Sequence, residues 1–207
     1  MPFADFFVSQ DVLKTPEIIS AFNAVKREDF VEGEAKEFAE YDQALPIGLG
    51  QTISQPYVVA FMLEHLKPKK GDRILDIGTG SGWTTALLSH IVGERGRIIG
   101  IEVIGKLAQL ARKHVAHYSF IEKGIVKIIE GDGRKGYKQE APYDGILVSA
   151  SMEDKELPSA FKEQLKVGGR IVIPIKESIW IFEKTGENQF KEEEYPGFVF
   201  VPLIKGL

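Results

Sequence analysis

Residues 73–82 read RILDIGTGSG, a short apolar run followed by a loop with a glycine at every second position. The apolar run, Arg73–Ile77, predicts a buried β-strand, and Trp83–Val92 directly after the loop predicts a helix. Glycine lets the backbone turn sharply and lets a ligand approach closely, while the start of a helix offers unpaired N–H groups. The stretch therefore predicts a strand, loop and helix unit that binds a ligand at its loop.

The alternation of strand and helix continues after this unit. We expect strands at residues 97–102, 126–130, 144–148 and 170–175, and helices at residues 104–117 and 158–165, the last ended by Gly168 and Gly169. Most of these strands are near-continuous apolar runs, as strands buried on both faces of a parallel sheet are. The sequence therefore predicts an α/β fold with a doubly wound, mostly parallel sheet.

Upstream of this core we expect helices at residues 16–25 and 55–66, separated by a glycine- and proline-bearing loop at residues 44–54. We expect one compact domain, in which residues 1–70 form an N-terminal helical extension with a substrate loop and residues 71–207 form the ligand-binding core.

Downstream of the core, residues 179–184 and 197–203 are expected to be closing strands. Residues 185–194, which include three consecutive glutamates, are expected to form a solvated polar turn between them.

Composition excludes several classes of protein. The chain has 207 residues, of which 43% are hydrophobic and 27% charged, as in ordinary globular proteins. It has no cysteine, which excludes disulfides, thiolate metal ligands and a cysteine nucleophile, and fits a reducing cytoplasm. The net charge of −4 provides no broad positive field for nucleic acid. No run approaches the roughly 18 apolar residues that span a bilayer, so neither nucleic acid nor a membrane is an expected partner.

Two further acidic residues follow neighbouring strands of the predicted sheet. Glu102 ends its strand 20 positions after Gly82, where a carboxylate can accept hydrogen bonds from ribose hydroxyls. Asp132, between Gly131 and Gly133, follows the next strand and could accept from an adenine amino group. Because parallel sheets bind ligands at the carboxyl ends of their strands, the set predicts a nucleotide site. The alternative is a set of turn glycines with solvated acids.

The glycine spacing separates two classes of nucleotide site. Dinucleotide loops usually run G-x-G-x-x-G, whereas this loop has Gly78, Gly80 and Gly82. With Asp76 before the first glycine, it resembles motif I of class I methyltransferases, whose cofactor has no pyrophosphate. A redox Rossmann enzyme is the alternative.

Residues 45–56, LPIGLGQTISQP, closely resemble the signature loop of protein-L-isoaspartate O-methyltransferases. Other segments resemble the same family in matching order along nearly the whole chain: residues 25–31, 41–42, 77–82, 131–133, 141–144, 164–166, 168–170 and 200–203. The resemblance implies a Rossmann-like class I methyltransferase fold that uses S-adenosyl-L-methionine. It also implies methyl transfer to the carboxylate of L-isoaspartyl residues in damaged proteins or peptides, which would be the chain's partners.

The resemblance also implies roles for individual residues. Ser54 matches the serine assigned to the active site, and Gln51, Thr52 and Ile53 match its neighbours in the substrate loop. The residues matching the cofactor site and its motifs are Asp76, Gly78, Thr79, Gly80, Ser81, Gly82, Glu102, Asp132 and Gly133. From position alone, Ser54 could equally be the N-cap of the helix that begins near Gln55. No metal site is expected, since the histidines lack metal-like partners.

This chain departs from the family pattern in three places. Residues 149–156 replace a Thr-Ala-Ala-Ala-Pro-like run, Pro174-Ile175-Lys176 replaces Pro-Val-Gly, and Trp83 stands where tyrosine is common. Glu153 and Asp154 add negative charge after the fourth core strand. We therefore expect a preference for acceptor peptides with basic residues near the isoaspartate.

Methyl transfer to a carboxylate requires no general base, because a carboxyl group with a pKa of about 4 is already ionised at neutral pH. The enzyme mainly aligns an oxygen with the methyl group and excludes water, which fits the lack of a convincing catalytic dyad or triad. Two other classes stay open: a methyltransferase for a different carboxylate, and a cofactor-binding protein without turnover.

Overall fold

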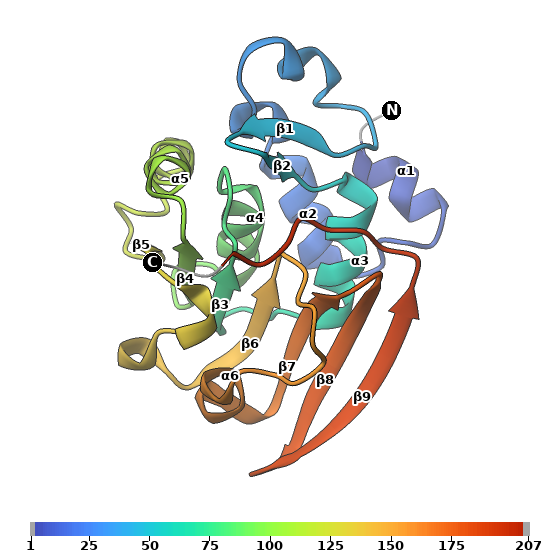
Figure 1. The fold of residues 1–207 in the computed structure, drawn as a ribbon. Helices are drawn as coiled ribbons and strands as arrows, with labels where there is room; N and C mark the ends of the chain where they lie inside the picture. Colours follow the sequence, from blue (N-terminus) through green and yellow to red (C-terminus); the bar gives the residue numbers. More distant parts are fainter. Residues whose placement is uncertain (1–2, 205–207) are drawn as a thin grey trace.

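Seven strands form one sheet in the computed structural model, which describes residues 3–204 (Figure 1). The strand order is β5-β4-β3-β6-β7-β8-β9, parallel from β5 to β7 and antiparallel from β7 to β9. The bounds are β3 Arg73–Ile77, β4 Arg97–Glu102, β5 Val126–Glu130, β6 Tyr143–Val148, β7 Leu165–Ile175, β8 Ser178–Gly186 and β9 Gln189–Pro196. The predicted α/β class and mostly parallel sheet are confirmed.

Helices cover both faces of this sheet. The helices are α1 Phe3–Ser9, α2 Pro16–Ala24, α3 Pro56–Leu66, α4 Trp83–Val92, α5 Gly105–His117 and α6 Ser159–Gln164. Short 3-10 helices lie at η1 Arg27–Phe30, η2 Gly33–Phe38, η3 Gly133–Lys135 and η4 Lys138–Glu140. Four helices, α2 to α5, contribute to one apolar cluster, whereas α6 contributes to the other, on the opposite face.

Alternation along the strands divides the buried side chains between these two clusters. Ile74 and Ile98 belong to the larger cluster, whereas Leu75 and Ile99 belong to the smaller one. The larger cluster also contains Phe7 from α1, so the N-terminal residues pack against the same core as the sheet. The predicted boundary near residue 70 falls in the turn between α3 and β3.

The predicted loop at residues 44–54 is wrong, because it contains an antiparallel hairpin of β1 Leu45–Gly48 and β2 Gln51–Ile53. Its turn uses Leu49 and Gly50, both with positive φ, at 54° and 72°. The glycines that suggested an irregular loop are the residues that let two very short strands reverse direction.

The predicted C-terminal strand at residues 197–203 and the polar turn at 185–194 are also wrong. Strand β9 runs through the three glutamates and pairs with β8, leaving a reversal of only two residues, Glu187 and Asn188. An edge strand paired on one side exposes most of its side chains, so it needs no apolar run, and its charges discourage pairing with other chains. Residues 197–203 instead run back across the carboxyl ends of β6 and β3 (Figure 1).

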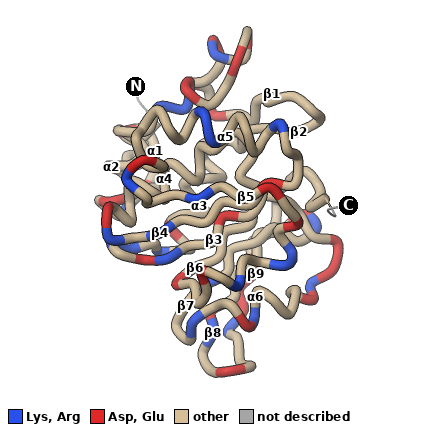
Figure 2. The backbone as a smooth tube through the Cα atoms, turned by 90° about the vertical axis from the view of Figure 1, so that its left-hand side faces the viewer, with Lys and Arg blue, Asp and Glu red and all other residues tan. Residues whose placement is uncertain are grey.

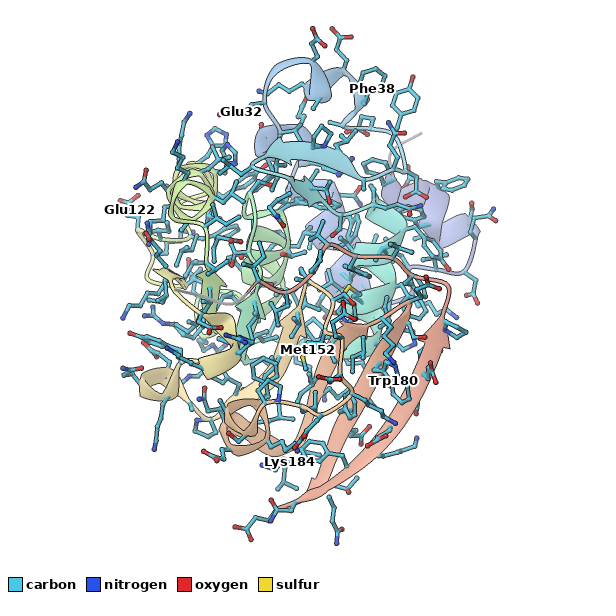
Figure 3. The ribbon with its side chains drawn as sticks, in the orientation of Figure 1. Glu32, Phe38, Glu122, Met152, Trp180 and Lys184 are labelled. Carbon is cyan, nitrogen blue, oxygen red and sulfur yellow. The ribbon has the colours of Figure 1, made fainter. Side chains whose placement is uncertain are left out.

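Strand β7 begins earlier than predicted, and Gly168 and Gly169 lie inside it rather than ending a helix. The end of α6 is capped by a side chain: Lys184 Nζ donates to the carbonyls of Lys162 and Leu165, at 2.6 and 2.9 Å (Figure 3). Gly169 is needed within β7 because a Cβ there would lie 2.7 Å from the Asp144 carbonyl oxygen.

Acidic and basic residues are interspersed along the whole backbone rather than gathered on one element (Figure 2). Among residues 3–204, no helix is long and apolar enough to cross a bilayer.

Candidate active site

A cleft lies at the carboxyl ends of β3, β4 and β6. Figure 1 shows the β1–β2 hairpin and the C-terminal segment above these strand ends. Its lining residues are Gln51, Thr52, Ile77, Gly78, Gly80, Ile101, Glu102, Val103, Ile104, Gly133, Ser149, Ala150, Val201, Pro202, Leu203 and Ile204. Folding thus brings the predicted substrate loop and three of the predicted cofactor motifs to one place.

The loop between β3 and α4 forms the floor of this cleft. Gly78, Gly80 and Gly82 all have positive φ, which glycine adopts without a steric penalty. Gly78 and Gly80 line the cleft, but Gly82 does not. A Cβ on Gly82 would lie 2.9 Å from Val115, so this glycine allows α4 to approach α5 closely.

Glu102 is the buried carboxylate that faces the cleft. Its Oε2 accepts a hydrogen bond from the Gly80 N–H at 2.8 Å, and its Oε1 accepts from the Ile104 N–H at 3.0 Å. A carboxylate has about four acceptor positions, so each oxygen can accept one more hydrogen bond. Glu102 therefore braces the glycine loop and still presents acceptors to a ligand.

Asp76 lies beneath the loop and does not line the cleft. It is fully buried, and its Oδ2 accepts from the hydroxyls of Thr84 and Thr85 at 3.1 and 2.5 Å. Burial raises the pKa of Asp76 to about 6, although the two hydroxyl donors act in the opposite direction. Thr79 is also buried, and its hydroxyl lies 3.4 Å from the Asp76 carbonyl oxygen. These two residues hold the loop in shape from below.

Asp132 lies at the far end of the cleft, where the neighbouring Gly133 lines it. Its carboxylate accepts from the Arg134 guanidinium at 2.9 and 2.5 Å and from the Arg134 backbone N–H at 3.1 Å. The Arg134 hydrogen bonds hold the pKa of Asp132 below its usual range. An adenine amino group at Asp132 would therefore share an ionised carboxylate with Arg134.

Ser54 stands where two depressions meet. One is a polar hollow against the glycine loop, lined by Thr52, Ile53, Ser54, Gly78, Thr79, Gly80, Ser81, Trp83, Thr84 and Ser149. The other is a groove lined by Ala44, Thr52, Ser54, Gln55, Val58, Ser149, Val199, Phe200 and Val201.

The N-cap interpretation of Ser54 is wrong. The N-cap of α3 is Gln55, and no capping hydrogen bond comes from its own side chain. The first turn is capped from a distance, because Asp42 Oδ1 accepts from the Tyr57 N–H at 2.8 Å. The Ser54 hydroxyl is thus free of that structural role.

Sequence reasoning missed Arg27, which is 1% exposed. Its guanidinium donates to the carbonyls of Ala39, Gln43 and Ser54 at 3.0, 2.7 and 3.1 Å. Burial lowers the pKa of Arg27 to about 10. The sequence offered only its place in the family-like segment 25–31. The side chain ties the backbone of Ser54 to the loop before β1.

Residues 149–156, where this chain departs from the family pattern, lie on both sides of the C-terminal segment. Ser149 and Ala150 line the cleft, whereas Met152 to Glu156 line a separate hollow that also contains Arg134 (Figure 3 labels Met152). Ser151 holds the segment in place, since its N–H donates to the Val201 carbonyl and its carbonyl accepts from the Leu203 N–H, both at 2.8 Å. Glu153 and Asp154 are therefore separated from Ser54 by residues 199–203.

Within residues 3–204, no group of three or more histidines and acids could hold a metal ion. His114 is buried against Phe30, and its Nδ1 lies 3.0 Å from the Ser81 carbonyl oxygen.

Comparison with known proteins identifies the family. The sequence profile of protein-L-isoaspartate(D-aspartate) O-methyltransferases matches residues 6–207. The chain belongs to this methyltransferase family. A protein-L-isoaspartate O-methyltransferase of Methanopyrus kandleri is 40% identical over 196 residues, which cover 93% of this chain and 85% of that protein. A second, from Archaeoglobus fulgidus, is 41% identical over 197 residues, which cover 94% and 88%.

The fold of the methyltransferase agrees with solved structures. A Plasmodium falciparum protein described as a protein-L-isoaspartate O-methyltransferase, solved with S-adenosyl-L-homocysteine, superposes with a TM-score of 0.86. It is 22% identical, and the match covers 98% of this chain and 96% of that one. The predicted family, class I fold, enzyme class, methyl-transfer activity and S-adenosyl-L-methionine cofactor are confirmed, and the redox alternative is wrong.

The residues present fit this cofactor. The cleft combines a glycine loop that a ligand can approach closely with the carboxylate of Glu102, and the start of α4 borders the adjoining polar hollow.

Proposed function

We propose that this methyltransferase modifies the free carboxylate of L-isoaspartyl residues in damaged proteins and peptides, as a repair reaction. The observation that carries the proposal is the position of Ser54 at the junction of the polar hollow and the groove. A peptide lying in the groove can bring one carboxylate to the glycine loop without entering the cofactor cleft. The cytoplasm as the compartment, and residues 1–70 as a substrate-binding extension of the core, belong to the same proposal.

The cofactor residues in this proposal are those of the strand ends. Glu102 accepts from the ribose hydroxyls, Asp132 accepts from the adenine amino group, and Gly78 and Gly80 leave room for the ligand above the loop. Asp76, Thr79, Ser81, Gly82 and Gly133 complete the assignment, with Asp76 and Gly82 acting through the shape of the loop. When bound, S-adenosyl-L-methionine supplies an activated methyl group on a sulfonium sulfur.

The acceptor residues follow from the groove. Ser54 donates a hydrogen bond to one carboxylate oxygen and leaves the other oxygen free to attack in line with the methyl group. Thr52 borders the groove, the polar hollow and the cleft, Ile53 borders the hollow, and Gln51 borders the cleft. Residues 199–201 close the other side of the groove and limit the access of water. No residue has to remove a proton, because the acceptor is already ionised.

The deciding experiment is methyl transfer from labelled cofactor to an isoaspartyl peptide, with its aspartyl counterpart as the control. Transfer to the isoaspartyl peptide alone supports the proposal. Transfer to other carboxylates but not to this peptide would favour a relative with a different acceptor, and cofactor binding without any transfer would favour a protein without turnover.

A further inference from the structure

Arg27, the first residue of η1, is a buried cation that forms no ion pair among residues 3–204. Its hydrogen bonds all go to backbone carbonyls: Nη1 donates to Ala39 at 3.0 Å and Tyr41 at 3.4 Å, and Nη2 donates to Gln43 at 2.7 Å and Ser54 at 3.1 Å. The Nε–H has no partner within the same residues. Because burying a charge without an opposite charge is costly, the guanidinium can still stabilise an anion.

The acids that face Arg27 compensate its charge only in part. Asp42 and Glu40 act to raise the pKa of Arg27, but burial outweighs both and lowers that pKa to about 10. Both acids are exposed, and the Asp42 carboxylate accepts hydrogen bonds from the Gln55 amide and the Tyr57 N–H. A group with a pKa near 10 is charged at neutral pH. Arg27 therefore carries a lasting positive charge inside the protein.

This charge lies behind one wall of the groove at Ser54. Arg27 itself does not line the groove, but its Nη2 bridges two segments that do, since Ser54 is a lining residue and Gln43 precedes the lining residue Ala44. None of the nine residues that line the groove is charged. The field of Arg27 thus reaches the groove through uncharged protein, which screens it less than water does.

We propose that Arg27 is a positioning residue for the acceptor, whose charge attracts the free carboxylate of an isoaspartyl residue to Ser54. This inference rests on the proposed function. Methylation removes the negative charge of the acceptor, so the same cation favours binding of the reactant over binding of the ester product. Two unit charges roughly 8 Å apart, at an effective dielectric constant of about 20, attract each other enough to change a binding constant by about 30-fold.

The variants Arg27→Gln and Arg27→Lys separate the charge from the structural hydrogen bonds. Glutamine keeps a donor for the backbone carbonyls but is neutral, whereas lysine keeps the charge with fewer donors. The matched control is Arg112→Gln on α5, because Arg112 also donates to a backbone carbonyl, that of Ile128, at 3.3 and 3.1 Å. Thermal unfolding and titration with S-adenosyl-L-homocysteine establish that each variant is folded and binds the cofactor product.

The experiment measures how well the protein distinguishes an isoaspartyl peptide from the same peptide with a carboxamide in place of the free carboxylate. Both peptides have uncharged flanking residues and are titrated calorimetrically into the S-adenosyl-L-homocysteine complex. The parent, Arg112→Gln and Arg27→Lys should prefer the carboxylate to within about threefold of one another, whereas Arg27→Gln should reduce the preference by about five- to 30-fold. In methylation assays, Arg27→Gln should raise KM by a similar factor and leave kcat within about twofold of the parent value.

A purely structural role would weaken both peptides equally in Arg27→Gln and Arg27→Lys, and that result would overturn the assignment. If Arg27→Gln does not fold, the parent supplies the test, because a buried charge is little screened by salt. Its preference for the carboxylate should change by less than about twofold between roughly 0.05 and 0.5 M salt, and a preference that is absent or lost at high salt would overturn the role of Arg27. A parent that methylates other carboxylates but not the isoaspartyl peptide would overturn the proposed function itself.

Discussion

Three carboxylates stand at or near the ends of β3, β4 and β5, and each has a different environment. Asp76 is buried beneath the loop, Glu102 faces the cleft, and Asp132 is paired with Arg134. The same side-chain chemistry therefore braces a loop at one strand end and offers acceptors to a ligand at the next. The effect of each site residue on ligand binding, turnover or stability can be measured by substituting one residue at a time.

Glu102→Ala should weaken binding of S-adenosyl-L-homocysteine by about 1.5–3 kcal/mol, the range for hydrogen bonds to charged groups. This corresponds to roughly a ten- to 150-fold rise in Kd, measured by calorimetric titration. The matched control is Glu130→Ala, which removes an exposed acid from the end of the next strand. Equal affinity of the parent and Glu102→Ala for S-adenosyl-L-homocysteine would show that Glu102 does not bind the cofactor.

Ser54→Ala should lower kcat/KM for an isoaspartyl peptide at least about tenfold while leaving cofactor affinity within about twofold, because its hydroxyl is assigned to the acceptor alone. Asp42 rather than Ser54 caps α3, so thermal stability should not change. Normal turnover in the variant, or a parallel loss of cofactor affinity, would contradict the assignment.

Asp76→Asn should change how stability depends on pH. The pKa of Asp76 is about 6 when folded and about 4 in an unfolded chain, so the folded state holds the proton more tightly. The free energy of unfolding therefore falls as pH rises between these values, by at most about 1.4 kcal/mol per pH unit from this group. In the variant this contribution disappears, so the stability of Asp76→Asn relative to the parent, measured by urea unfolding, should rise from pH 4 to pH 7, because asparagine resembles the protonated acid and carries no buried charge at pH 7. Parallel pH profiles would refute the raised pKa.

At the scale of elements, the proposed substrate loop is built from two strands that would be only marginally stable on their own. Strands β1 and β2 have four and three residues, and isolated two-stranded hairpins are marginally stable. Arg27 and Asp42 fix them by long-range hydrogen bonds to the backbone of Ser54 and to the first turn of α3. The proposed acceptor site thus depends on hydrogen bonds from residues outside the hairpin itself.

Asp42→Ala should destabilise the protein by about 1 kcal/mol, the typical cost of losing a helix cap. Asp42→Asn keeps an oxygen that can accept from the Tyr57 N–H, so its stability should lie close to that of the parent. Urea denaturation of both variants provides the measurement. Equal stability of all three proteins would mean that the first turn of α3 needs no external cap.

At the scale of the whole molecule, the C-terminal segment separates two depressions that lie next to each other. Val201 to Ile204 line the cleft at the carboxyl ends of β3 and β4, while Pro202 and Leu203 also line the hollow that contains Glu153 and Asp154. The acids are exposed and across the segment from Ser54. The carboxylates of Glu153 and Asp154 can therefore influence an acceptor peptide by long-range electrostatics, but they do not contact an acceptor carboxylate bound at Ser54.

The parent should favour lysine-flanked over glutamate-flanked isoaspartyl peptides by about 1.5- to fivefold in kcat/KM, the range for exposed charge pairs. Glu153→Ala/Asp154→Ala should bring the ratio close to one, and added salt should narrow it, because screening acts beyond roughly 8–10 Å at 0.1–0.15 M. A ratio that survives the double substitution would show that the preference arises elsewhere, and a ratio near one in the parent would show that these acids face only solvent.

The sequence by itself determined the parts whose structure depends on local patterns. The bounds of β3, β4, β5 and α4 were predicted to the residue, because buried parallel strands are continuous apolar runs and a glycine loop separates strand from helix. The family and the set of candidate site residues also came from local motifs, since each motif is contiguous in the chain.

Only the tertiary structure decided the features that depend on partners distant in sequence. Strand β9 exists because β8 pairs with it, the cap of α3 comes from Asp42, and Arg27 reaches Ser54 across 27 positions. Likewise, only the three-dimensional structure shows that the Ser81 hydroxyl and the Trp83 indole N–H are buried without a hydrogen-bond partner among residues 3–204. Whether a buried polar group has a hydrogen-bond partner depends on residues that are distant in sequence and close in space. A local sequence pattern therefore does not show which polar groups are paired.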